Sequence, residues 1–166
     1  MSLEDLARLD CRALADLYAV GSVPASLAAL DGAPVGRMLA VRALDRGPVA
    51  RLLRGIAGSR HFVWAGKSFE AAGPTSGHGV NRVRAPGLLG LQKLFPFETR
   101  FGASALDGAP TVVLDYDLAD NPPYIRRVHD EIREVSPGLF LGPAMWKAQG
   151  SPRHTVLWFA LDTARP

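Results

Sequence analysis

The polar segment from residue 115 to residue 133 holds side chains suited to proton transfer. Asp115 ends an alternating apolar run, and Arg126, His129 and Arg133 follow it along the chain. A histidine beside a carboxylate can act as a general acid or base near neutral pH. One hypothesis is that one of these three basic residues contacts Asp115 at the polar end of an apolar pocket. The alternative is a solvated face with surface ion pairs.

A cofactor-independent isomerase, cyclase or lyase would use this group. His129 or Asp115 would move the proton, and Arg100 or Arg126 would stabilise the developing negative charge. These four residues are the candidate catalytic residues. Because Val112, Leu114 and Tyr116 would share one face of a strand, Asp115 is expected on the opposite face.

Aromatic residues on candidate strands could line the apolar part of the pocket. The candidate ligand-binding residues are Trp64, Phe97, Phe101, Tyr116, Trp146 and Trp158. Sheets of about eight strands can close around one small ligand, whereas smaller barrels are filled by their own side chains. The pattern therefore leaves open a ligand cavity or a solid aromatic core.

Other chemistries find little support in the sequence. Gly66-Lys67-Ser68 lacks the earlier glycine of a phosphate-binding loop, since His61 stands there. No glycine pattern of a dinucleotide-binding fold is present, so no cofactor is expected. The four histidines are far apart, and no metal site is predicted unless distant residues assemble one. Cys11 is expected to fill space.

The charge of the chain is mildly positive. Sixteen of the 19 basic residues are arginine, the net charge is +3 and the isoelectric point is about 9.4. Nucleic-acid binders gather their cations into a patch, whereas these are spread along the sequence. Nucleic acid is therefore not an expected partner. A protein-interaction domain with a basic binding face remains a third possibility.

The 166 residues are expected to form one domain, 1–166. No apolar run is long enough to span a bilayer, and acidic residues near the start argue against a signal peptide. A cytoplasmic protein without a membrane partner is expected. The single cysteine excludes an intramolecular disulfide, and the sequence gives no indication of the oligomeric state.

Periodicity predicts an α+β fold, with an N-terminal helix in residues 1–20 and a barrel-like sheet over 35–162. Asp10 interrupts the apolar stripe of that helix, so the helix breaks there or buries a carboxylate. Two further helices are expected near 48–57 and 122–135. The second is expected because Asn121 can cap a helix and the apolar residues that follow have helical spacing.

About seven antiparallel strands are expected in this sheet. Their ranges are 35–44, 61–70, 80–84, 94–103, 111–116, 139–148 and 154–162. Residues 73–79 and 85–91 are expected to be loops. Pro96 predicts an edge or a bulge, and Asp107-Gly108 predicts a hairpin turn.

Residues 130–142, which run from Asp130-Glu131 through Pro137-Gly138 to Gly142, resemble a pattern of uncharacterised bacterial lipocalin-like or calycin-like proteins. The resemblance covers about Trp64 to Leu161. It implies a small antiparallel barrel or half-barrel with helical covers and no specific activity. The chain differs from true lipocalins in lacking a secretion signal and an early Gly-x-Trp.

These observations favour intracellular binding of a small, largely apolar or aromatic molecule in a barrel cavity. The enzyme described above is the alternative, and it would use the same cavity.

Overall fold

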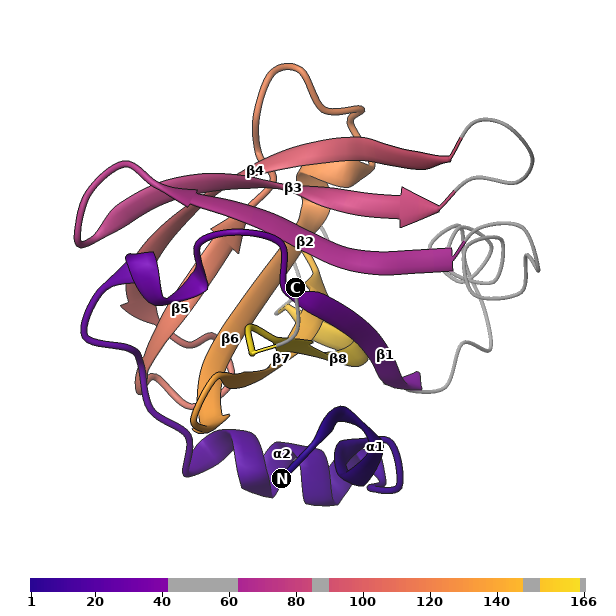
Figure 1. Cartoon of the computed structure of the whole chain (residues 1–166), viewed down its shortest axis with the longest axis vertical. Coiled ribbons are helices and arrows are strands. Elements are labelled where there is room, and N and C mark those ends of the chain that lie inside the picture. The colour runs from indigo at the N-terminus through magenta and orange to yellow at the C-terminus, as the bar shows by residue number, and fades with distance from the viewer. Residues whose placement is uncertain (42–62, 85–89, 148–152, 165–166) are drawn as a thin grey trace.

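The computed structural model describes residues 1–41, 63–84, 90–147 and 153–164. Within these residues, eight antiparallel strands pair in sequence order, and the first also pairs with the last, so the sheet closes into a barrel (Figure 1). The strands are β1 (Val35–Val41), β2 (Val63–Ala71), β3 (Ser76–Arg84), β4 (Leu91–Ala103), β5 (Pro110–Asp115), β6 (Val128–Ser136), β7 (Leu139–Trp146) and β8 (His154–Asp162). The prediction of an antiparallel β-barrel with few helices is confirmed.

The predicted helix over 122–135 is wrong, and the same error explains the count of seven strands. Only a 3-10 turn, η3 (Ile125–Arg127), follows the two prolines, and β6 begins at Val128. β6 pairs with β5 on one edge and β7 on the other, which satisfies its backbone groups in both directions. The long-range ladder therefore outweighs the local helical spacing, and β6 is the eighth strand.

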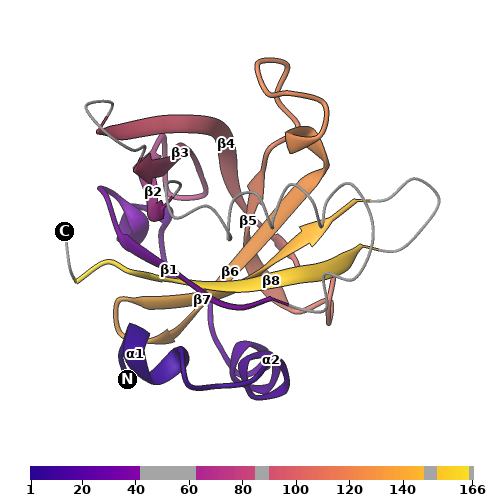
Figure 2. The same cartoon turned by 90° about the vertical axis from the view of Figure 1, so that its right-hand side faces the viewer.

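The N-terminal segment forms two short helices, α1 (Leu3–Leu6) and α2 (Cys11–Ala19). Of the two alternatives at Asp10, the structure shows the break, because its carboxylate accepts a hydrogen bond from the Ala13 amide at 2.8 Å and caps α2. Both helices pack on the outside of the barrel (Figure 2). Their buried residues Leu6 and Leu14 contact the apolar outer face that includes Trp158 on β8.

The structure also corrects the predicted loop over 73–79, since β3 already begins at Ser76. Of the edge or bulge predicted at Pro96, the structure shows a bulge, because the β3–β4 register shifts where Asn81 pairs with Leu94 and Val80 with Pro96. The predicted hairpin at Asp107-Gly108 joins β4 to β5. The helix expected near 48–57 lies outside the described residues. No helix among the described residues is long and apolar enough to cross a membrane.

The barrel interior is filled at one end by apolar side chains. Phe69, Phe97, Val112 and Ile132 belong to this core. The 3-10 turn η1 (Leu27–Leu30) packs against the same core. The other end, where β6 and β8 begin, contains a cavity.

Candidate functional site

The cavity lies inside the barrel and has a volume of about 130 Å³. A single water needs only about 10–15 Å³, and a dry cavity of about 150 Å³ takes up benzene. The lining residues are Met38, Trp64, Lys67, Asn81, Val83, Phe95, Tyr116, Ile125, Val128, Asp130, Ala144, Leu157 and Phe159. The lining is mostly apolar, with one group of polar side chains.

Lys67 and Asp130 form an ion pair in this wall, with Nζ and Oδ2 2.9 Å apart. Their side chains are only 3% and 4% exposed. Lys67 also donates to Asn81 Oδ1 at 2.9 Å and to the Tyr116 hydroxyl at 2.5 Å. A buried charge is tolerated only when it is paired and hydrogen-bonded, as it is here. We call Lys67, Asn81, Tyr116 and Asp130 the interior polar cluster.

Strand geometry brings these residues together. Asp130 lies between Val128 and Ile132 on β6, and the alternation of a strand places all three on the inner face. Lys67 on β2 is the register partner of Asn81 on β3. Lys67 and Asp130 come from strands that are not neighbours, so barrel closure is required for their contact.

The remaining contacts of the cluster involve Tyr116 and Trp64. The Tyr116 hydroxyl donates to Asp130 Oδ2 at 3.1 Å and accepts from the Asn81 amide at 3.1 Å. The Trp64 indole donates to Asn81 Oδ1 at 3.1 Å. Asp130 Oδ1 is different, because it is buried and has no hydrogen-bond partner among the described residues.

Burial controls the electrostatics of the cluster. It lowers the pKa of Lys67, and the neighbouring Asp130 carboxylate opposes this effect. Burial also raises the pKa of Tyr116 well above its usual value, with Asp130 adding to the shift. The ammonium lies 5.1 to 5.5 Å from four aromatic ring centroids, and these rings favour a cation there. The rings belong to Trp64, Phe97, Tyr116 and Phe159.

Phe95 lies at the bulge of β4 and lines the cavity beside the cluster. Its φ of 60° is in the left-handed region, which a bulky residue rarely adopts. The Phe95 carbonyl accepts a hydrogen bond from the Asn81 amide at 3.3 Å. The bulge thus supplies both an apolar wall and a partner for the polar cluster.

The candidate catalytic residues lie outside the cavity. Asp115 forms its ion pair with Lys147, at 3.2 Å. Of the three basic residues considered from the sequence, His129 is the register partner of Asp115 on β6 and acts on it electrostatically, but no ion pair joins the two side chains. Arg126 pairs with Asp117 at 2.7 Å on the surface. Arg100 is exposed on β4. The expectation that Asp115 and Tyr116 lie on opposite faces is correct.

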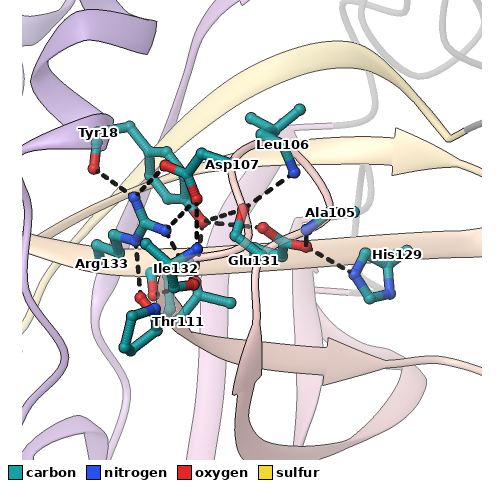
Figure 3. Close-up of polar contacts among 12 residues, drawn as sticks. Tyr18, Ala105, Leu106, Asp107, Thr111, His129, Glu131, Ile132 and Arg133 are labelled. Carbon is teal, nitrogen blue, oxygen red and sulfur yellow. Dashed lines mark hydrogen bonds and ion pairs between the residues drawn. The ribbon is translucent and has the colours of Figure 1, made fainter.

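His129 also lies outside the barrel, because its neighbour Asp130 points inward. It belongs to a second polar network beneath α2 (Figure 3). His129 Nε2 lies 2.9 Å from Glu131 Oε1, and the Tyr18 hydroxyl donates to Glu131 Oε2 at 2.9 Å. The position of His129 therefore gives no support to proton transfer in the cavity.

Arg133 belongs to this second network and joins the hairpin loop to α2. Its guanidinium makes two hydrogen bonds to Asp107, at 2.7 and 2.8 Å, and one to the Tyr18 carbonyl at 3.1 Å (Figure 3). Burial raises the pKa of Glu131, but hydrogen bonds from His129 and the Ala105 amide outweigh it and lower the pKa overall. The network holds α2 against the barrel.

The candidate ligand-binding residues occupy three different environments. Trp64 and Tyr116 line the cavity. Phe97 and Phe101 belong to or pack against the solid core. Trp158 lies on the outer face, where its ring centroid is 5.7 Å from that of Tyr18. Trp146 is half-buried at the end of β7 and is not a lining residue. Two of the six candidate residues therefore line the cavity.

Lys67, Asn81 and Asp130 were not identified from the sequence as site residues. Lys67 belongs to the Gly66-Lys67-Ser68 segment, which does not match a phosphate-binding loop. Its position two residues before Phe69 on a strand would have indicated an inward side chain. Asp130 lies two residues from both Val128 and Ile132, so on a strand all three side chains share one face. Because this segment was predicted to be a helix, that indication was missed.

Within the described residues, no group of three histidine, cysteine, aspartate or glutamate side chains is placed to hold a metal ion. The chain matches no protein-family model. No curated protein is significantly similar to it in sequence.

A crystal structure of a protein from Thermomonospora curvata is similar to the present fold. The two chains are 21% identical and superpose with a TM-score of 0.51. The match covers 95% of this chain and 89% of the other. At this level of identity the likeness concerns the fold, which is a small antiparallel barrel.

Proposed function

We propose that this protein binds a small, largely apolar molecule inside its barrel. The observation that carries the proposal is the cavity of about 130 Å³, whose apolar lining is interrupted by one buried polar cluster. Ligand sites typically combine apolar walls with a few polar groups that fix the orientation of the ligand. Apolar walls provide the affinity, because a bound molecule removes its own apolar surface from water.

Trp64 provides a direct probe of binding. Its ring lines the cavity, and its centroid lies 5.8 Å from that of Phe159, which also lines the cavity. A ligand in the cavity would therefore change the environment of this indole. We expect saturable changes in tryptophan fluorescence on titration with small aromatic compounds. Native mass spectrometry of freshly purified protein should also detect any retained ligand.

A cavity-filling variant tests the location of the site. Ala144 lines the cavity, so Ala144→Phe should fill it and weaken binding at least tenfold. Ala119 is exposed in the segment after β5, and Ala119→Phe is the matched control that should bind normally. The absence of saturable binding to a broad panel of lipids and aromatic compounds would refute the proposal. Equal binding by both variants would place the ligand elsewhere.

No specific observation favours the enzyme hypothesis formed from the sequence. The residues assigned to proton transfer, His129 and Asp115, lie on the outer side of the barrel. Membership of a lipocalin-like or calycin-like group and an intracellular location remain predictions from the sequence, and both are compatible with the proposed binding function.

A further inference from the structure

The hydrogen bonds of the interior polar cluster restrict what a ligand can offer it. An ammonium has three N–H groups, and Lys67 gives one each to Asn81 Oδ1, the Tyr116 hydroxyl and Asp130 Oδ2. Lys67 therefore has no N–H group left for a ligand. The Lys67 ammonium is therefore not free to bind an anionic group of a ligand.

The other donors of the cluster are also used. The Asn81 amide gives its two N–H groups to the Phe95 carbonyl and the Tyr116 hydroxyl. The Tyr116 hydroxyl donates to Asp130 Oδ2, and the Trp64 indole donates to Asn81 Oδ1. Among the described residues that line the cavity, no side-chain donor remains unused.

One acceptor of the cluster has no hydrogen-bond partner among the described residues. Asp130 Oδ2 receives two hydrogen bonds, from Lys67 and Tyr116, whereas Oδ1 receives none from the described residues. The Asp130 side chain lines the cavity but is only 4% exposed, and Oδ1 itself is buried, so a ligand reaches this oxygen once the carboxylate turns toward the cavity. An unsatisfied buried carboxylate oxygen is costly, so a donor placed beside it would be strongly stabilised.

We propose that the cavity selects small apolar molecules that carry a hydroxyl or N–H donor, with Asp130 Oδ1 as its acceptor. This inference rests on the proposed binding function and adds the chemical class of the ligand. Phenols, small alcohols and N–H heterocycles fit this class. Ligands whose polar groups only accept hydrogen bonds gain no partner from the cluster.

Phenol and toluene form a suitable probe pair, because a hydroxyl replaces a methyl group of similar size. Their dissociation constants should be measured by tryptophan fluorescence and calorimetry in wild type and in Asp130→Asn. The toluene-to-phenol ratio of dissociation constants should be at least about tenfold larger in wild type, as expected for a hydrogen bond to a charged group. Both probes are measured with wild type and with the variant. The difference in hydration free energy between phenol and toluene is the same for both proteins and therefore cancels when the two ratios are compared.

Two further variants control for side effects of this substitution. Asp117→Asn makes the same chemical change on the surface, where Asp117 pairs with Arg126, and should retain the wild-type ratio. If Asp130→Asn does not fold, Lys67→Met/Asp130→Leu replaces the ion pair by apolar residues, a change that buried pairs often tolerate. This double variant should lose the preference for phenol while retaining toluene.

Wild-type protein alone provides an independent measurement. After correction for partition between water and octanol, phenol should bind more tightly than benzaldehyde, which only accepts hydrogen bonds. If the probes bind but show no difference between wild type and variants, or if benzaldehyde equals phenol, the ligand class is wrong and the binding function stands. If no probe binds saturably, both the binding function and this inference fail.

Discussion

Lys67 and Asp130 are 63 residues apart in the sequence, yet their side chains form an ion pair inside the barrel with Nζ and Oδ2 2.9 Å apart. The strands that carry them are not adjacent in the sheet. The contact therefore spans the interior, and it depends on closure of the whole barrel.

Removal of one partner of this pair should strongly destabilise the fold. Lys67→Met leaves the Asp130 charge buried and unpaired, which should cost about 3–5 kcal/mol of unfolding free energy. Lys67→Met/Asp130→Leu should recover at least half of this loss, since neither charge remains. Urea unfolding of the four proteins in the double-mutant cycle, with Asp130→Leu as the fourth, measures both effects. A single variant as stable as wild type would contradict the prediction.

The Tyr18 hydroxyl should stabilise the docking of α2. It contacts Glu131 Oε2 at 2.9 Å and Thr111 Oγ1 at 2.9 Å, both in buried surroundings. Tyr18→Phe leaves the carboxylate short of a donor and should cost about 1–3 kcal/mol in chemical denaturation. Tyr124 is exposed, so Tyr124→Phe is the matched control and should be neutral. Equal stabilities of the two variants would refute this role.

The pair of Asp107 and Arg133 should make stability depend on acid pH. The hydrogen bonds from Arg133 lower the pKa of Asp107 to about 2. Because the pKa is lower in the folded state, the stabilisation is fully present above the unfolded value of about 3.9 and is lost as pH falls toward 2.

Asp107→Asn should therefore reduce the unfolding free energy near neutral pH by about 1 kcal/mol, a value discounted because Asp107 is partly exposed. The difference from wild type should shrink progressively below about pH 4. Urea unfolding across an acid pH series measures it. A difference that stays constant over the series would show that the ionised pair is not the cause.

Gly142 on β7 should tolerate no side chain. A Cβ atom built there would lie 1.7 Å from the Glu131 carbonyl oxygen on β6. Gly142→Ala must therefore displace one of two paired strands and should cost at least about 2 kcal/mol in thermal or chemical unfolding. The control is Gly73→Ala, whose nearest neighbour would be Ser76 Oγ at 3.7 Å. If Gly142→Ala is as stable as Gly73→Ala, the two strands accommodate the added methyl group and the prediction is wrong.

The sequence alone predicted the features that depend on residues close to one another in the sequence. The alternation around β4 and β5 separates inward Phe97 and Tyr116 from outward Asp115, because successive strand residues point to opposite faces. The break at Asp10 is equally local, since the carboxylate caps an amide three residues away. These predictions needed no information about distant strands.

Only the tertiary structure decided that residues 128–136 form a strand and that β1 closes the barrel against β8. The spacing of Val128 and Ile132 fits either a helix or a strand, and pairing with β5 and β7 selects the strand. That choice turns Asp130 inward and His129 outward. The site could not be predicted from local patterns, because the meeting of Lys67 and Asp130 depends on the order and closure of all eight strands.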